Sequence, residues 1–220
     1  MNLPKGWSKY EQAERVIRYL RPYSYVNLGV GMPGIVAEML DDTRNIYFHC
    51  ENGIIGYRGL ESEEEVDLDI IDAATKPVGL IAGAAVVAHD LSFAIARGGR
   101  LDTAVLGAFQ VSESGDLANW KSPNALIAGV GGAMDLAVGA KEVIVMMKHL
   151  DKSGAAKIVR DCTYPITARK VVDYIVTEFA VMVINSSGLA VVEMADGMTA
   201  EILASITEAN FTLNLSRAGI

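Results

Sequence analysis

The chain reads YVNLGVGMPG from Tyr25 to Gly34, and this stretch determines the fold class. Tyr25–Leu28 is a short apolar strand, the glycines after it form a turn, and a helical pattern runs from Ile35 to Leu40. Strand, glycine turn and helix in this order are typical of an α/β sheet whose turns lie at the carboxyl ends of the strands. We therefore expect an α/β fold.

The rest of the chain continues this alternation. We expect Pro77–Ala82 and Thr103–Leu106 to be buried parallel strands, and the acidic stretch Leu60–Asp69 to be an irregular surface segment. We find no internal repeat and no linker, so residues 1–220 are predicted to form a single domain. The other predicted helices are Glu11–Leu20, Leu91–Ala96 and Thr199–Ile206, and the other predicted strands are Ile46–His49, Glu142–Met147 and a hairpin of Val181–Ile184 with Leu189–Glu193.

Composition excludes several classes of function. The 220 residues are 51% hydrophobic and 21% charged, which excludes a disordered chain or a coiled coil. The net charge is −8 without a cluster of Lys and Arg, so no nucleic-acid partner is expected. The longest apolar run, Val78–Ala88, is too short to span a bilayer, and Met1–Lys9 lacks the apolar core of a secretory signal. We expect a cytoplasmic enzyme or enzyme subunit without a membrane partner.

A carboxylate stands at the end of one predicted strand. Glu51 follows the strand Ile46–His49 by two residues and precedes Asn52 and Gly53. Asn-Gly forms tight turns, in which neighbouring backbone N–H groups can face a side chain. Such a carboxylate can act as a nucleophile. By position alone, however, a Glu before Asn-Gly is more often an ordinary turn residue.

A glycine-rich segment is the second candidate for a site. Gly129–Leu136 reads GVGGAMDL, and successive glycines let the backbone present N–H groups as an anion-binding concavity. Such a concavity suits an oxyanion. The alternative is a close-packed turn that leads into a helix. Asn27, at the end of the first strand, can offer its amide either to a ligand or to an ordinary hydrogen bond of the strand end.

Other chemistries lack their motifs. His49, His89 and His149 are dispersed and nothing has the spacing of zinc ligands, so we expect no metal. Gly29–Gly31 does not match the dinucleotide-binding fingerprint, because the third glycine is misplaced and a proline interrupts the turn. Cys50 is predicted to pack under the turn as a small buried residue rather than to react.

Phe48–Gly56 resembles the active-site signature of the β subunit of class I, 3-oxoacid-type, CoA transferases. That signature usually reads Ser-Glu-Asn-Gly, followed by two aliphatic residues and a small one, and this chain has CENGIIG from Cys50. The resemblance extends through nearly the whole chain in register. Its other segments are Asn27–Pro33, Phe93–Gly99 with Leu101–Asp102 and Val105–Ala108, Gly115–Trp120, Gly129–Leu136 and Cys162–Thr167.

The resemblance implies a fold and a reaction. The fold would be an α/β domain with a mixed, mostly parallel sheet flanked by helices, which some sugar-phosphate isomerases share. In the reaction, Glu51 would attack an acyl-CoA and then carry CoA as a glutamyl thioester, so that CoA is substrate and covalent intermediate and no cofactor is permanently bound. The other implied site residues are Gly131, Gly132 and Ala133, whose N–H groups would stabilise an oxyanion, and Asn27, Asn52 and Gly53, which would line the pocket.

Three positions depart from the family pattern. Cys50 replaces the usual serine, and Arg100 stands where the family generally has histidine. Tyr57 and Arg58 begin a segment that differs from the family's loop, and we consider them candidates for substrate specificity. The forked donors of Arg58 would suit the second carboxylate of a dicarboxylic acid, although a solvated surface arginine is the simpler alternative.

The resemblance also implies a partner. An α subunit of similar fold would supply the other wall of the site, in a heterodimer or heterotetramer. Two alternatives stay open: an acyl-CoA hydrolase on the same fold, and a ligand-binding domain without catalysis. The acid is not determined by the sequence, since acetoacetate, 3-oxoadipate, succinate, acetate and butyrate all fit the family.

Overall fold

The computed structural model describes residues 3–40, 44–60, 66–123 and 129–215. Its helices are α1 (Lys9–Tyr19), the 3-10 helix η1 (Met32–Gly34), α2 (Ile35–Met39), α3 (His89–Arg97), α4 (Ala133–Gly139) and α5 (Ala200–Ser205). Its strands are β1 (Tyr25–Leu28), β2 (Tyr47–Cys50), β3 (Ile54–Arg58), β4 (Gly79–Val86), β5 (Thr103–Leu106), β6 (Gln110–Ser112), β7 (Leu117–Ala118), β8 (Glu142–Met146), β9 (Ile158–Val159), β10 (Tyr174–Val176), β11 (Ala180–Asn185), β12 (Gly188–Met194) and β13 (Thr212–Leu213).

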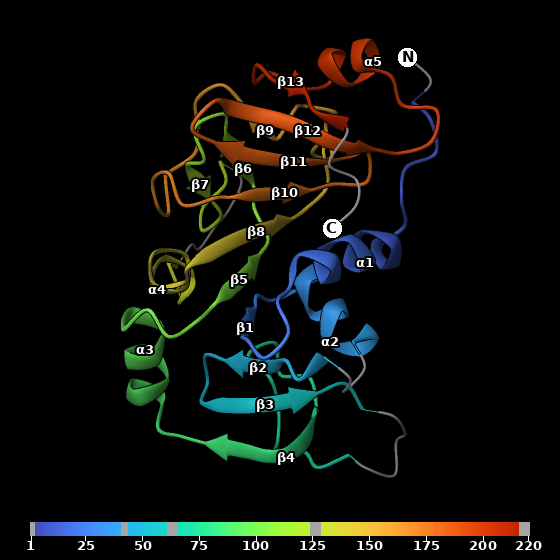
Figure 1. Ribbon diagram of the computed structural model, residues 1–220. Coiled ribbons are helices and arrows are strands. Elements are labelled where there is room, and N and C mark those ends of the chain that lie inside the picture. The colour runs from blue at the N-terminus through green and yellow to red at the C-terminus, as the bar shows by residue number, and fades with distance from the viewer. Residues whose placement is uncertain (1–2, 41–43, 61–65, 124–128, 216–220) are drawn as a thin grey trace.

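One large sheet organises the described residues. Its strand order is β13-β12-β11-β10-β8-β5-β1-β2-β3-β4, from the top of Figure 1 to the bottom. The central strands β2, β1, β5, β8 and β10 are parallel. Antiparallel pairs extend them on both sides, β3 and β4 at one end and β11 and β12 at the other. The predicted α/β class with a mixed, mostly parallel sheet is therefore confirmed.

The sheet separates two apolar cores. Along β8, Val143 and Val145 face one core and Ile144 and Met146 face the other, because successive side chains of a strand point to opposite faces. Helices α1 and α2 pack on one face, whereas α3, α4, α5 and the small sheet β7-β6-β9 contribute to the core on the other. Burial on both faces explains why the central strands read as nearly continuous apolar runs.

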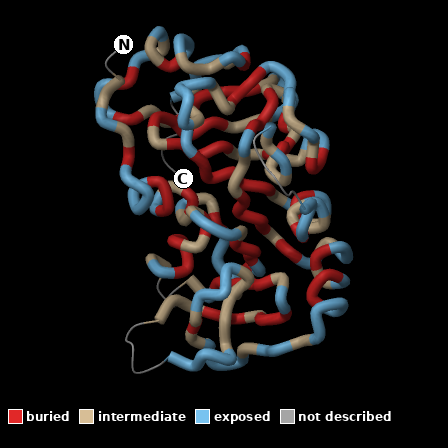
Figure 2. Tube along the Cα trace, turned by 180° about the vertical axis from the view of Figure 1, so that it is seen from behind, coloured by how far each residue is buried: buried red, intermediate tan, exposed pale blue. Residues whose placement is uncertain are grey.

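Most predicted elements are present, and one is corrected. Pro77–Ala82 was expected to be a buried parallel strand, but β4 runs from Gly79 to Val86, pairs antiparallel with β3 and is largely exposed. Figure 2 shows this edge of the sheet in the exposed and intermediate colours. The run is apolar because it consists of aliphatic residues with Ala and Gly, and apolar composition alone does not distinguish a central strand from an edge strand.

A second correction concerns the segment after Glu51. Tyr57 and Arg58 were expected to begin an irregular loop, but they belong to β3, which pairs antiparallel with β2. The Asn-Gly that precedes β3 is a hairpin signal, and it turns the chain straight back along β2. Of the acidic stretch Leu60–Asp69, residues 61–65 lie outside the described residues, and residues 66–69 are exposed.

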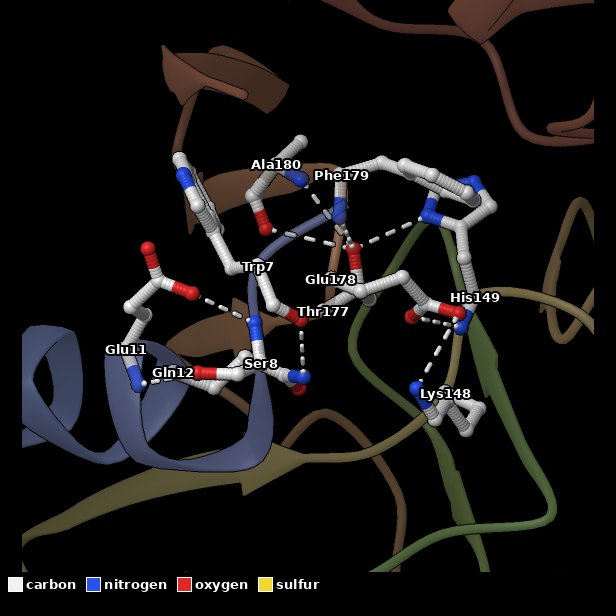
Figure 3. A network of polar contacts seen from close by, with 10 residues as sticks. All are labelled: Trp7, Ser8, Glu11, Gln12, Lys148, His149, Thr177, Glu178, Phe179 and Ala180. Carbon is white, nitrogen blue, oxygen red and sulfur yellow. Dashed lines mark hydrogen bonds and ion pairs between the residues drawn. The ribbon is translucent and has the colours of Figure 1, made fainter. Parts of the chain in front are cut away.

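The N-terminal segment is fastened to the other half of the molecule. Trp7 N donates to Glu178 O at 2.7 Å, and Ser8 caps α1 in a reciprocal pair with Glu11. The carboxylate of Glu178 in turn accepts from the backbone N–H of His149 at 2.8 Å (Figure 3). These bonds tie the start of α1 to the loops that follow β8 and β10.

Candidate active site

Glu51 lies in the loop of the β2–β3 hairpin. Cys50 pairs with Ile54, so residues 51–53 form the loop, and Gly53 N donates to Cys50 O at 3.0 Å. Gly53 has φ of +123°, a conformation that glycine adopts without the steric cost of a side chain. An added Cβ there would also overlap Val87 O. The sequence Asn-Gly is thus required by the turn that presents Glu51, as predicted.

The turn opens into a pocket of ≈ 480 Å³ at the carboxyl ends of three adjacent parallel strands. Gly29 and Val30 follow β1, Glu51 follows β2, and Gly107 follows β5. Ligands of open α/β sheets bind at this end of the strands. The remaining lining residues are Leu106, Ala108, Phe109, Asn119, Gly129, Val130, Gly131, Gly132, Ala133 and Leu136.

The Glu51 carboxylate is half-buried and weakly solvated. Burial raises its pKa above the ordinary glutamate value, and the charge of nearby His89 acts in the opposite direction. No described residue donates a hydrogen bond to the carboxylate. An anion in this state is a stronger base and nucleophile than a carboxylate capped by donors, because no hydrogen bond must be broken before it attacks.

The structure brings Glu51 against the glycine-rich segment. A Cβ built on Gly132 would overlap Glu51 Oε2 and lie 2.9 Å from Phe93 Cζ, so this position has no room for a side chain. Gly131, just before it, has φ of +58°. Helix α4 begins at Ala133 and packs closely on α3, where a Cβ on Gly139 would overlap Ala96 O. The predicted neighbourhood of Glu51 and residues 131–133 is therefore present.

Asn27 is placed beneath the turn rather than in the pocket lining. Its side chain is 1% exposed, and Nδ2 donates to His49 O at 3.0 Å and lies 3.1 Å from His49 Nδ1. Its Oδ1 is buried without a partner among the described residues. Asn27 thus contacts the strand that carries Glu51, and its predicted contact with a ligand stays a prediction.

The remaining candidates brace the hairpin or lie away from the pocket. Asn52 is exposed and donates from Nδ2 to Ile71 O at 2.7 Å. Cys50 is buried, as predicted, and its Sγ accepts from Ala73 N at 3.0 Å. Tyr57 is buried and its ring lies 5.6 Å from that of Phe48, while Arg58 Nη1 donates to Gly59 O. Neither Tyr57 nor Arg58 lines the pocket of Glu51, so their proposed role in specificity finds no support here.

Sequence reasoning did not single out part of the pocket. Phe109 and Asn119 line it, and Asn119 donates to Gly107 O at 3.2 Å and thereby holds the turn after β5. That turn follows a strand expected to be buried and parallel, so the rule that sites gather at strand ends would have indicated it. His89 and Phe93, at the start of α3, carried no comparable signal, because their approach to Glu51 depends on tertiary packing.

Within the part of the chain that the structure describes, no group of three or more His, Cys, Asp or Glu side chains is arranged to hold a metal ion. A search of the same residues for a helix of sufficient length and hydropathy to cross a bilayer finds none.

The family is established by sequence comparison. Residues 10–205 match the model of the family described as coenzyme A transferase. A match over this much of the chain shows that the protein belongs to the coenzyme A transferase family, and the resemblance seen in its motifs is confirmed.

Particular relatives narrow the class. The chain is 47% identical to the B subunit of 3-oxoadipate CoA-transferase from Pseudomonas putida, over 88% of this chain and 91% of the relative. It is 40% identical to the B subunit of succinyl-CoA:3-ketoacid coenzyme A transferase from Helicobacter pylori, over 92% of this chain and 97% of the relative. Among solved structures, the acyl-CoA transferase of Escherichia coli O157:H7 superimposes with a TM-score of 0.75 at 21% identity, covering 98% of this chain and 43% of that chain. This last match shows a common fold.

Proposed function

We propose that this chain is the β subunit of a 3-oxoacid-type CoA transferase, and that Glu51 is its nucleophile. The observation that carries the proposal is the state of the Glu51 carboxylate. It is half-buried, lacks a hydrogen-bond donor among the described residues and lies in a ≈ 480 Å³ pocket at the strand ends. The membership of the family and the names of the relatives support the same reaction.

The reaction is a double displacement. A Glu51 carboxylate oxygen attacks the thioester carbonyl of the donor and expels CoA thiolate, which leaves a mixed acyl-glutamyl anhydride. The thiolate then attacks the glutamyl carbonyl, expels the donor's carboxylate and forms a glutamyl-CoA thioester. An acceptor carboxylate repeats the two steps in reverse order, which yields the new acyl-CoA and regenerates Glu51. Each step passes through a tetrahedral oxyanion.

Backbone N–H groups of residues 131–133 are proposed to stabilise the oxyanion on the glutamyl carbon. The contact between Gly132 and Glu51 Oε2 supports this assignment, because it places the backbone beside the atom on which negative charge develops. One donor of this kind typically contributes about 3–4 kcal/mol to the stabilisation of a transition state.

A second, different chain is proposed to cover the site. The rim of the pocket is apolar and exposed, with Val30 63%, Phe109 40% and Val130 36% accessible. Exposed apolar side chains around a pocket are typical of a surface that a partner covers. The names of both relatives describe one of two kinds of chain in their enzymes, which supports an α subunit as this partner, in a heterodimer or heterotetramer.

The acid is proposed to be a 3-oxo acid. The names of the relatives, which refer to 3-oxoadipate and to 3-ketoacids, support this class and leave the particular acid open.

The test uses the chain co-purified with its α subunit. The complex is incubated with succinyl-CoA, with and without acetoacetate or 3-oxoadipate, and all CoA species are quantified by chromatography. New acyl-CoA that forms in proportion to added acid is the expected result. Steady release of free CoA without an acid would instead assign a hydrolase, and absence of both reactions with any acid would contradict an enzymatic role for this pocket.

A further inference from the structure

Polar side chains from three elements are buried together beneath the Glu51 turn. Asn27 on β1, His49 on β2 and Ser92 on α3 are 1%, 1% and 0% exposed. Ser92 Oγ lies 2.9 Å from His49 Nε2, and Asn27 Nδ2 lies 3.1 Å from His49 Nδ1. The proposed reaction uses neither His49 nor Ser92, although the two strands and the helix converge on them.

The direction of each hydrogen bond follows from the fixed acceptors. The carbonyl of His49 can only accept, so Asn27 must present its amide NH₂ to it, and the second hydrogen of that NH₂ points to Nδ1. His49 Nδ1 is therefore unprotonated, and the neutral ring carries its hydrogen on Nε2. That hydrogen is donated to Ser92 Oγ, and Ser92 donates its own to Cys50 O at 3.3 Å.

This network ends on the backbone that precedes the nucleophile. Cys50 O accepts from Ser92 Oγ and also from Gly53 N, the bond that closes the Glu51 turn. Side chains thus hold the carbonyls of His49 and Cys50, the two residues immediately before Glu51. A buried chain of this kind limits the positions that the turn can adopt.

We propose that His49 and Ser92 are positioning residues that fix the Glu51 carboxylate against Gly132 through the Cys50 carbonyl. This inference rests on the proposed nucleophilic role of Glu51. A nucleophile displaced by about 1 Å can lose about a hundredfold in rate, so partial release of the turn is expected to slow attack without weakening CoA binding.

Two substitutions at position 49 separate the links of the network. His49→Gln keeps a donor near the position of Nε2 and hence the bond to Ser92, whereas His49→Asn keeps only an acceptor near the position of Nδ1. Ser92→Ala removes the central hydroxyl. The matched control is Thr207→Val, which removes the hydroxyl bonded to Nε2 of the second buried histidine, His149, far along the chain.

The experiment measures, in the complex with the α subunit, the rate at which acyl-CoA converts the chain to its CoA adduct. The donor is whichever of succinyl-, acetoacetyl- and acetyl-CoA the wild type uses best, and the apparent KM for it and the melting temperature are recorded in parallel. We expect Ser92→Ala and His49→Asn to slow adduct formation by about tenfold or more with KM unchanged, and His49→Gln to stay within about threefold of the wild type.

The control decides between positioning and general stability. Thr207→Val is expected to lower the melting temperature without slowing adduct formation. The inference is overturned if Ser92→Ala forms the adduct at the wild-type rate, or if Thr207→Val slows it equally. Absence of the adduct in the wild type itself would instead overturn the nucleophilic role of Glu51, which is a separate result.

Discussion

Two carboxylates in this molecule occupy similar places in the chain and differ in chemical state. Glu51 and Asp151 each follow a buried histidine, His49 or His149, by two residues and lie in a turn. Asp151 Oδ1 accepts hydrogen bonds from Ser153 N, Ser153 Oγ and Ala155 N at 2.7–2.9 Å, whereas no described residue donates one to Glu51. The same arrangement thus holds one capped and one uncapped carboxylate.

The pKa values follow the same division. The Ser153 hydroxyl, followed by backbone N–H groups, holds the pKa of Asp151 below its ordinary value, whereas burial raises the pKa of Glu51. A capped carboxylate must break hydrogen bonds before it can attack, and an uncapped one in a pocket need not. The comparison shows that the turn alone does not make a nucleophile: desolvation and freedom from donors do.

The largest effect is expected from removing the uncapped carboxylate. Glu51→Gln should lower the transfer rate by on the order of 10⁴–10⁶, since it removes the attacking group, and Glu51→Asp by about a hundredfold, since it withdraws the carboxylate by about 1 Å. Asp151→Asn is the matched control and should lower the melting temperature with little change in rate. Steady-state transfer assays of the three variants check this, and near-normal activity of Glu51→Asp would show that Glu51 does not attack.

Crowding the uncapped carboxylate should have the next largest effect. Gly132→Ala places a methyl group against Glu51 Oε2 and Phe93 and should displace the carboxylate, with a loss of about a hundredfold in rate. Gly34→Ala is the control, because a Cβ there meets nothing within 4 Å and Gly34 does not line the Glu51 pocket. The ratio of the two rates is the measurement. Equal rates would mean that the approach of Gly132 to Glu51 is irrelevant to the reaction.

The histidine beneath the capped carboxylate should appear in stability rather than in catalysis. Burial lowers the pKa of His149 to about 4 from 6.5, and its Nδ1 and Nε2 lie within hydrogen-bond distance of Thr177 and Thr207. The unfolded chain therefore binds a proton more readily, so this contribution is complete above about pH 6.5 and is lost as the pH falls toward 4. The loss amounts to roughly 3 kcal/mol.

Denaturant unfolding of the wild type and His149→Gln between pH 4 and 7 checks this contribution. The wild type should lose stability more steeply with falling pH than the variant. Because burial also lowers the pKa of His49, the variant should keep part of the slope. Parallel curves for the two proteins would contradict the assignment.

The smallest effect is expected at His89. Its positive charge lowers the pKa of Glu51, so His89→Gln should raise that pKa and move the acid limb of the kcat/KM profile to higher pH. The pH–rate profile of the variant measures the shift. A shift to lower pH, or none, would mean that His89 does not act on the reactive carboxylate.

Local signals predicted much of the sheet and the turn of the site. Tyr25–Leu28 and Thr103–Leu106 are apolar strands followed by glycine, and both lie at the centre of the sheet as expected. Glu51 could be placed on a tight turn, because Asn-Gly specifies one wherever it occurs. These features depend on neighbours in the sequence and are therefore visible in it.

Features that depend on distant neighbours were not predictable. The exposure of Gly79–Val86 follows from its place at the edge of the sheet, which its apolar composition does not encode. The bonds between Ser92 and His49 join residues 43 positions apart, and the capping of Asp151 but not of Glu51 depends on where donors lie in space. Tyr57 is half of a ring contact in the core, although its sequence neighbours suggested a loop.

Detection of the covalent intermediate tests the central claim most directly. The complex is mixed with acyl-CoA in the absence of an acceptor acid, digested, and analysed by mass spectrometry for peptides that carry CoA. The account predicts a CoA adduct on the peptide that contains Glu51, absent from Glu51→Gln and discharged when an acceptor acid is added. Transfer activity without any adduct on that peptide, or an adduct that persists in Glu51→Gln, would contradict it.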